Sequence, residues 1–250
     1  MSTVALTFDP ARFKLLPSAR GGLRIWQEPE AGKLYVAGID TSKGGAKSDF
    51  AALAMVETAS RDLVATWHGR YDPTSWGRMC ARLGLYYNEA MLAFETHPSQ
   101  HGLSACLAAR DMGYSNLYRR QSQGMVEFRM SEELGWATTF KTKPLMIDRV
   151  RVALAENYKI PSADLLRELL GFKRDEGGNV VSTAQHDDLF VAYSIAQLVA
   201  DVVGITGYVS RGPERPMSWT QAWWKHRNAT LEHGAKHGAR RPTARLQDGT

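Results

Sequence analysis

Four acidic residues stand where apolar segments end or begin, and acids in this arrangement suit the binding of divalent cations. Asp40 closes the run LYVAGID, Glu95 closes the run MLAFE, and Asp187 and Asp188 open a long apolar segment. A glutamate at the end of a buried strand is costly to desolvate without a partner. Clustered carboxylates repel one another unless a cation or a proton lies between them. Because hard oxygen ligands in this number favour Mg²⁺ or Mn²⁺ over zinc, the pattern predicts a metal site.

Each of these acids also has an ordinary structural explanation. Asp40 is followed by the polar residues Thr41 and Ser42, so its carboxylate is alternatively the cap of a turn. Asp187 or Asp188 is alternatively the N-cap of a helix, where free amides and the helix dipole favour negative charge. The residues alone leave these alternatives open.

The elements that position the acids follow from hydrophobic periodicity. Three strand-like runs joined by short polar turns predict an antiparallel meander, after which strands alternate with helices. The predicted strands span 34–40, 50–57, 62–70, 91–95 and 115–120. The predicted helices span 72–86, 98–112, 142–158, 163–172 and 187–203, with a hairpin tip at 176–179 and an irregular stretch at 121–141. This order predicts an α/β domain with a mixed five-stranded sheet.

The charge of the chain is concentrated near its C-terminus. Residues 207–250 hold eight Lys and Arg against three Asp and Glu, so they carry the whole net charge of +5. A basic end commonly meets phosphate, and the alternative is a solvated tail without a specific partner. We expect a lead-in segment at 1–33, a folded domain at 34–206 and a basic tail at 207–250.

The cellular setting is predicted from what the sequence lacks. It contains no apolar run of about 18 residues and no secretory signal, so no membrane association is expected. Cys80 and Cys106 fall in predicted helices without metal-ligand spacing, which favours reduced, buried thiols. These features indicate a cytoplasmic protein.

Other motifs are less specific. The segment GGAKS at 44–48 departs from the order of a nucleotide-binding phosphate loop, because Ala46 separates Gly45 from Lys47. Three histidines lie next to predicted ligands and either contact metal or phosphate or make local hydrogen bonds: His97, His101 and His186. A cluster in the tail either stacks on bases or docks the tail on a protein surface, and it comprises Trp219, Trp223, Trp224, Lys225, His226 and Arg227.

From about Leu34 to Val203 the chain resembles the nuclease domain of the large terminase subunits of tailed bacteriophages. The matching segments are YVAGIDTSKGGAKSDFAALAMV, LGLYYNEAMLAFETHPSQHG, GYSNLYRR, GWATTFKTKPLMIDRV and AQHDDLFVAYSIA. The resemblance implies a ribonuclease H-like fold, with a mixed central sheet of five or more strands flanked by helices. It also implies endonuclease activity on double-stranded DNA that depends on Mg²⁺ or Mn²⁺. By position, the family's metal-binding acids match Asp40, Glu95 and the pair Asp187 and Asp188.

The chain departs from the family at two places. Many members carry Asn-x-x-Gly after the glutamate, whereas residues 96–102 form a longer segment here. Large terminase subunits also carry an ATPase motor ahead of the nuclease, and this chain has no Walker A motif. We therefore expect an excised domain or a separately encoded nuclease, in which residues 1–33 resemble the motor–nuclease linker. The implied partners are double-stranded DNA, the ATPase motor domain, the small terminase subunit and the portal, in the cytoplasm of the infected host.

The implied reaction is hydrolysis of a phosphodiester by two metal ions about 3.5–4 Å apart. Asp40 is expected to bridge both ions, while Glu95 and Asp188 each hold one and Asp187 is a ligand or a supporting partner. Candidates for gripping the DNA backbone, which are alternatively ordinary surface lysines, are Lys43, Lys47, Lys141 and Lys143. Two other function classes remain: an actin-like or sugar-kinase-like phosphotransferase, and a non-catalytic DNA-binding module of a packaging complex.

Overall fold

The computed structural model describes residues 5–9, 14–17, 22–44, 50–123, 130–174, 180–182 and 186–206. The chain divides into two units, Met1–Pro213 and Glu214–Thr250, and the second lies outside the described residues. The elements below all belong to the first unit. The predicted basic tail at 207–250 and the hairpin tip at 176–179 fall outside the described ranges.

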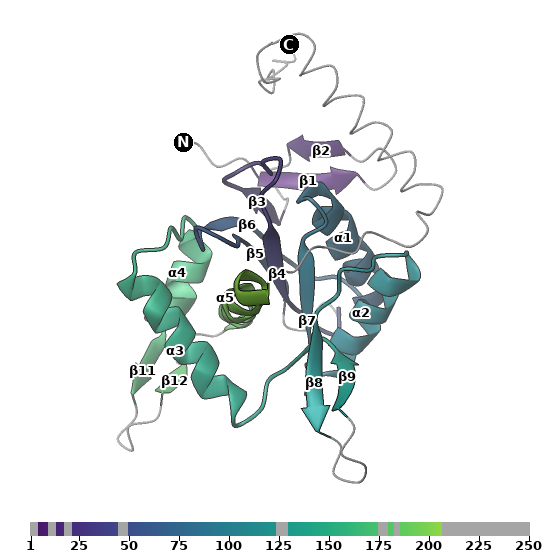
Figure 1. Ribbon diagram of the computed structural model, residues 1–250. Coiled ribbons are helices and arrows are strands. Elements are labelled where there is room, and N and C mark those ends of the chain that lie inside the picture. The colour runs from purple at the N-terminus through teal and green to yellow at the C-terminus, as the bar shows by residue number, and fades with distance from the viewer. Residues whose placement is uncertain are drawn as a thin grey trace, which may run out of the picture. The chain divides into compact units, whose positions relative to one another are not determined.

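A single mixed sheet of eight strands forms the centre of the first unit (Figure 1). Its strands are β1 (Ala5–Asp9), β2 (Lys14–Pro17), β3 (Leu23–Ile25), β4 (Tyr35–Asp40), β5 (Ala51–Glu57), β6 (Leu63–Gly69), β7 (Met91–His97) and β10 (Trp136–Ala137). They are arranged in the order β10-β7-β4-β5-β6-β3-β1-β2. The strands β4, β5 and β6 form the antiparallel meander that the sequence predicts, and β7 pairs with β4 in parallel. The expectation of a mixed sheet of five or more strands is confirmed.

Five helices flank this sheet within the described residues: α1 (Pro73–Tyr86), α2 (Gln100–Asp111), α3 (Thr142–Ala155), α4 (Ala163–Leu170) and α5 (Asp188–Thr206). All five agree with helices predicted from periodicity. Figure 1 shows α3, α4 and α5 on one face of the sheet, with α1 and α2 on the other. None of the described helices has both the length and the apolar character that crossing a membrane requires.

The stretch 121–141 differs from its predicted irregular structure. It contributes the end of β8 (Arg119–Gln123), all of β9 (Met130–Leu134) and β10, and β8 pairs with β9 in a separate two-stranded sheet. The strand predicted at 115–120 is also displaced, because only Leu117 bridges to Leu92 beside β7 before the chain enters β8. Both errors have one cause. The sequences RRQSQ and MSEEL are polar, so they lack the apolar alternation by which strands are recognised.

The segment 1–33 contributes strands that the sequence analysis does not predict. The strand β3 pairs antiparallel with β6, and β1 and β2 extend the sheet beyond it. Prolines and paired glycines interrupt the periodicity of this segment, which explains why its strands escape recognition. The second two-stranded sheet, β11 (Phe172–Arg174) with β12 (Val180–Ser182), lies between α4 and α5 in the chain.

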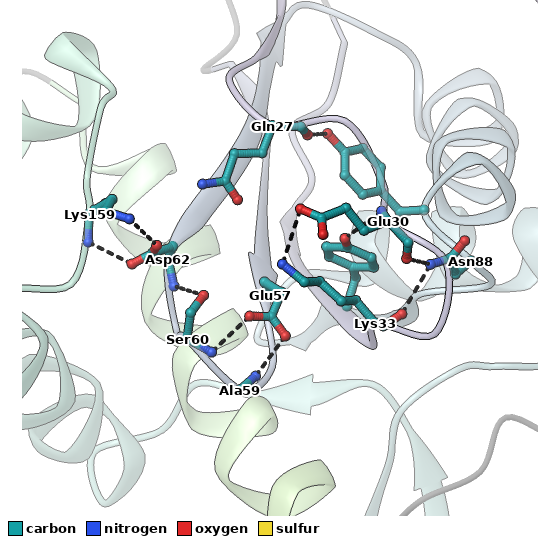
Figure 2. Close-up of polar contacts among 11 residues, drawn as sticks. Gln27, Glu30, Lys33, Glu57, Ala59, Ser60, Asp62, Asn88 and Lys159 are labelled. Carbon is teal, nitrogen blue, oxygen red and sulfur yellow. Dashed lines mark hydrogen bonds and ion pairs between the residues drawn. The ribbon is translucent and has the colours of Figure 1, made fainter. Parts of the chain in front are cut away.

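Two polar clusters fix the loops at the end of the sheet away from Asp40 (Figure 2). In the first, the Tyr87 hydroxyl donates to the carbonyl of Gln27 at 2.8 Å. The Asn88 amide donates to the carbonyls of Glu30 and Lys33 at 2.7 and 3.0 Å. These bonds tie the loop before β4 to the end of α1.

The second cluster closes the turn between β5 and β6. The Glu57 carboxylate accepts from the amides of Ala59 and Ser60 at 2.9 and 2.8 Å. The Asp62 carboxylate accepts from the Lys159 amide at 3.0 Å and lies 3.2 Å from its ammonium group. The turn is thereby joined to the connection between α3 and α4 (Figure 2).

The sheet and α5 come into close backbone contact at Gly38 in the middle of β4. A Cβ atom at this position would stand 1.9 Å from the carbonyl oxygen of Ala192 and 2.6 Å from the amide nitrogen of Ala196. Both are backbone atoms of α5, which cannot move aside as a side chain can. The absence of a side chain at Gly38 therefore lets the backbone of α5 rest directly on β4.

We expect Gly38→Ala to lower the free energy of unfolding by about 3 kcal/mol or more, because overpacking against backbone forces α5 away from the sheet. Urea denaturation of both proteins measures the difference. Gly32→Ala is the control: Gly32 has a φ of +81°, and an added Cβ there meets nothing within 4 Å. That variant reports backbone strain alone, at about 1 kcal/mol. Equal losses in the two variants would contradict the close-packing explanation.

Candidate active site

The register of two parallel strands brings Asp40 and Glu95 together. Residues Val36 to Ile39 of β4 pair in sequence with Met91 to Phe94 of β7, and the two acids follow immediately on both strands. Paired strands lie about 4.8 Å apart. Because Gly38 faces α5 and side chains alternate along a strand, Asp40 also faces α5, and Glu95 does so by the same register.

The first residue of α5 and the residue just before it supply the second pair of acids. Asp188, Ala192 and Ala196 are four residues apart, so they share the face of the helix that rests on β4. Asp188 is 6% exposed and lies one helical turn before the contact with Gly38, which brings it over the end of β4. Asp187 is half-buried, and its carbonyl accepts from the Val191 amide at 2.9 Å. The structure thus brings all four predicted acids to the C-terminal ends of the neighbouring strands β4 and β7.

The acids perturb one another electrostatically. Burial raises the pKa of Asp40 well above its usual range, and the charges of Glu95 and Asp188 raise it further. Burial also raises the pKa of Glu95, with a further contribution from Asp187. The hydrogen bond between Asp40 and Glu95 raises the pKa of Asp40 and lowers that of Glu95. Burial and mutual repulsion thus favour a form of the pair in which the two carboxyl groups hold a proton between them.

Two other residues act on Glu95. The Thr138 hydroxyl is hydrogen-bonded to the carboxylate, and the nearby ammonium group of Lys143 also favours its charged form, so both lower its pKa. No sequence pattern singles out Thr138, because it lies in the stretch expected to be irregular. Lys143 is one of the lysines expected to grip the DNA backbone, and in the structure its charge acts on Glu95.

The chemistry of the four acids fits a hard divalent cation. The Oδ2 atom of Asp188 is buried and makes no hydrogen bond within the described part of the chain. Carboxylate oxygens are the preferred ligands of Mg²⁺ and Mn²⁺, and a cation relieves the repulsion among them. Among the residues described, no three or more Asp, Glu, His or Cys side chains already surround a common point at ligand distance.

The turn-capping alternative for Asp40 holds in part. Its Oδ1 atom accepts from the Thr41 amide at 2.7 Å, and its carbonyl accepts from the Trp76 indole at 3.2 Å. These bonds fix the end of β4. They leave the carboxylate able to interact with Glu95 and Asp188, so turn capping and membership of the acidic cluster are compatible.

The alternative role of Asp187 or Asp188 as the N-cap of α5 is filled in part by another residue, Glu168 of α4. Its Oε2 atom accepts from the Phe190 amide at 2.8 Å, and the Leu189 amide also donates to the carboxylate. These are amides of the first turn of α5, which have no partner within the helix. A glutamate from another helix therefore stabilises the start of α5. The sequence held a signal for Glu168, since it shares the buried face of α4 with Leu165.

The candidate histidines and lysines have different positions. His186 Nδ1 lies 3.9 Å from Asp188 Oδ2, whereas His97 is exposed at the end of β7 and His101 lies in the first turn of α2. A histidine that the sequence analysis does not name, His68 of β6, approaches Asp188 more closely, at 3.6 Å. The lysines Lys43, Lys141 and Lys143 are exposed near the ends of β4 and at the start of α3, and Lys47 lies outside the described residues.

We expect Glu168 to make the stability of the metal-free protein depend on pH. Burial raises the pKa of Glu168 from 4.5 to about 7, so between these values the folded state binds more protons than the unfolded state. The free energy of unfolding should fall as pH rises through this window, by roughly 3 kcal/mol from this group. Glu168→Gln, which keeps an acceptor oxygen, should lack this part of the fall. Urea denaturation in EDTA from pH 4.5 to 8 measures it, and parallel curves for the two proteins would contradict the assignment.

Comparison with known proteins supports the fold. No protein-family model matches this sequence, and no curated protein matches it either. Among solved structures, the large terminase nuclease of the thermophilic phage G20c with bound magnesium is 14% identical, with a TM-score of 0.55 over 78% of this chain and 92% of that chain. The large terminase nuclease domain of Thermus phage P74-26 is 14% identical, with a TM-score of 0.50 over 77% of this chain and 88% of that chain. This chain therefore has the ribonuclease H-like fold of phage large-terminase nuclease domains, as the sequence predicts.

Proposed function

We propose that this chain is a divalent-metal-dependent endonuclease that cuts double-stranded DNA during viral genome packaging. The observation that carries the proposal is the convergence of Asp40, Glu95, Asp187 and Asp188 from β4, β7 and α5 on one edge of the sheet. Burial and mutual repulsion raise the pKa of Asp40 and of Glu95 there. The fold shared with phage terminase nucleases, one of them solved with bound magnesium, supports it.

The proposed cofactor is a pair of Mg²⁺ or Mn²⁺ ions held by these carboxylates. Such ions, when bound, polarise a phosphodiester and lower the pKa of a water nucleophile. Asp40 interacts electrostatically with both Glu95 and Asp188, so we assign it the bridging position. Glu95, oriented by the Thr138 hydroxyl, and Asp188 are the ligands on either side. The charge of Asp187 acts on Glu95, so we assign Asp187 as a further metal ligand or as a supporting charge beside the ligands.

The surroundings of the acids suit the backbone of DNA. Lys43, Lys141 and Lys143 are exposed, and phosphate contacts from such lysines give affinity without sequence choice. We assign them to the DNA backbone together with Lys47. The partners in this proposal are double-stranded DNA, an ATPase motor domain, a small terminase subunit and a portal, acting in the cytoplasm of the infected host.

One pair of assays separates this proposal from the other function classes. The purified chain is incubated with supercoiled plasmid in Mg²⁺, Mn²⁺ or EDTA, and its hydrolysis of ATP is measured in parallel. A nuclease cuts the plasmid in either ion and leaves it intact in EDTA. A phosphotransferase turns over ATP without cutting, and a DNA-binding module shifts the mobility of the plasmid without doing either.

We expect Asp40→Asn to reduce plasmid cleavage more than about 100-fold, because loss of a ligand exceeds the usual effect of losing a supporting contact. The asparagine keeps an acceptor for the Thr41 amide. It removes a group that repels two other carboxylates, so the metal-free free energy of unfolding should stay equal or rise. Asp111→Asn, at the exposed end of α2, is the matched control. A purified Asp40→Asn protein that still cuts DNA would refute the assignment.

We expect the basic tail to contribute to DNA affinity. Each lost phosphate contact should reduce the slope of log affinity against log salt by about 0.9. The test is a full-length variant in which glutamine replaces Arg215, Lys225, Arg227, Lys236, Arg240, Arg241 and Arg245. Its affinity for duplex DNA, measured at several salt concentrations, should be lower and less salt-dependent, while cleavage at saturating DNA stays unchanged. An unchanged slope would favour a tail that docks on a protein partner.

A further inference from the structure

Four residues form a row across the sheet at the level of the acids. Asp40 pairs with Ala52 of β5, and Ala52 pairs with His68 of β6. Glu95 follows the register of β7 beside Asp40. Paired residues point to the same face of a sheet, so all four side chains face α5. The row therefore runs Glu95, Asp40, Ala52, His68, and the small side chain of Ala52 leaves space between Asp40 and His68.

Asp188 reaches down from α5 into this row. Its charge raises the pKa of Asp40 on one side, and its Oδ2 atom lies 3.6 Å from Nε2 of His68 on the other. Both atoms are buried, and neither has a hydrogen-bond partner within the described part of the chain. A buried donor and a buried acceptor that face each other just beyond hydrogen-bond distance form a bond after a small shift of either side chain.

The structure limits how far His68 can move away. Its backbone is held on one side by Ala52 and on the other by Gly22, whose carbonyl accepts from the His68 amide at 3.1 Å. The ring of Phe50 packs on the imidazole at 4.6 Å between centroids, and the guanidinium of Arg70 covers Phe50 at 4.0 Å. Strand pairing thus fixes the backbone of His68, and packing against Phe50 restrains its imidazole ring.

The main chain of Asp188 is restrained from another direction. Glu168 accepts from the Phe190 amide in the first turn of α5, and the helix rests on Gly38 one turn after Asp188. The rotation of its carboxylate is therefore the main freedom left to this residue. Hydrogen bonds to metal-binding carboxylates restrict that freedom in metal sites.

Building on the proposed metal site, we propose that His68 is a positioning residue: its Nε2–H donates to Oδ2 of Asp188 and sets the orientation of that carboxylate toward Asp40. His68 does not touch the substrate and acts through Asp188 alone. It therefore determines how well the acids bind a cation, and its effect requires the carboxylate of Asp188. The neutral imidazole with its proton on Nε2 is sufficient for this role.

The test measures the affinity of the full-length, metal-free protein for Mn²⁺ by calorimetry without DNA. We expect His68→Ala to weaken Mn²⁺ binding about 10- to 100-fold. His68→Gln should restore affinity to within a few-fold, because its amide nitrogen reaches the position of Nε2. His68→Asn is one bond shorter and should not. Tyr87→Phe, which removes a hydrogen bond at the other end of the sheet, controls for a general loss of stability.

A double-mutant cycle separates positioning from a structural role. In an Asp188→Ala background, which leaves no side-chain acceptor for Nε2 of His68, His68→Ala should change Mn²⁺ affinity by less than twofold. An equal loss in both backgrounds would overturn the inference, as would wild-type affinity in His68→Ala or equal affinities in the Gln and Asn variants. If the wild-type protein binds Mn²⁺ and the His68 variants all have the same Mn²⁺ affinity, only the role of His68 is refuted. A wild-type protein that binds no Mn²⁺ refutes the proposed metal site, and this role with it.

Discussion

The arrangement of the site depends on the direct contact between the backbone of α5 and the backbone of β4 at Gly38. Any larger residue there would hold the helix away from the sheet, since a Cβ atom would stand 1.9 Å from a helix carbonyl. With the helix in contact, Asp188 lies above the end of β4, where Asp40 ends its strand beside Glu95 of β7. The same contact buries the apolar face of α5 against Val36, Ala93 and their neighbours. One close approach therefore builds both the core and the acidic cluster.

This acidic cluster works against the stability of the fold. Burial and mutual repulsion oppose the charged forms of Asp40 and Glu95, and in the metal-free protein the two groups share a hydrogen bond. Glu168 adds another buried carboxyl, and its hydrogen bonds with amides at the start of α5 offset part of the cost of burying it. Carboxyl groups with raised pKa values are common at functional sites, and a bound cation would offset the repulsion among them.

The sequence is sufficient to predict the elements that carry the four acids. Asp40 and Glu95 end runs that are apolar enough to be buried strands, and Asp188 begins a run with a helical apolar face. The polar hairpin of β8 and β9 carries no such pattern, so its strands are invisible to periodicity. The strand β3 is missed for a related reason, because glycines and prolines surround it.

His68, Thr138 and Glu168 required the structure for another reason. Each acts on an acid or a helix end that is distant in sequence, through strand register or the approach of two helices. His68 lies two strands from Asp40, and only the pairing of both residues with Ala52 places it in the same row. Local pattern contains no information about such register. Of these three residues, only Glu168 has a signal in the sequence, because it is a carboxyl on the buried face of an amphipathic helix.

The central claim is that a cation replaces the proton that Asp40 and Glu95 share. Calorimetric titration of the metal-free chain with Mn²⁺ at about pH 6.5, in two buffers with different ionisation enthalpies, counts the protons released on binding. Metal binding requires deprotonated ligands, so it releases protons wherever the free ligands hold them. We expect net proton release in the wild-type protein and less in Asp40→Asn. Mn²⁺ binding without proton release, or no binding at all, would contradict this account.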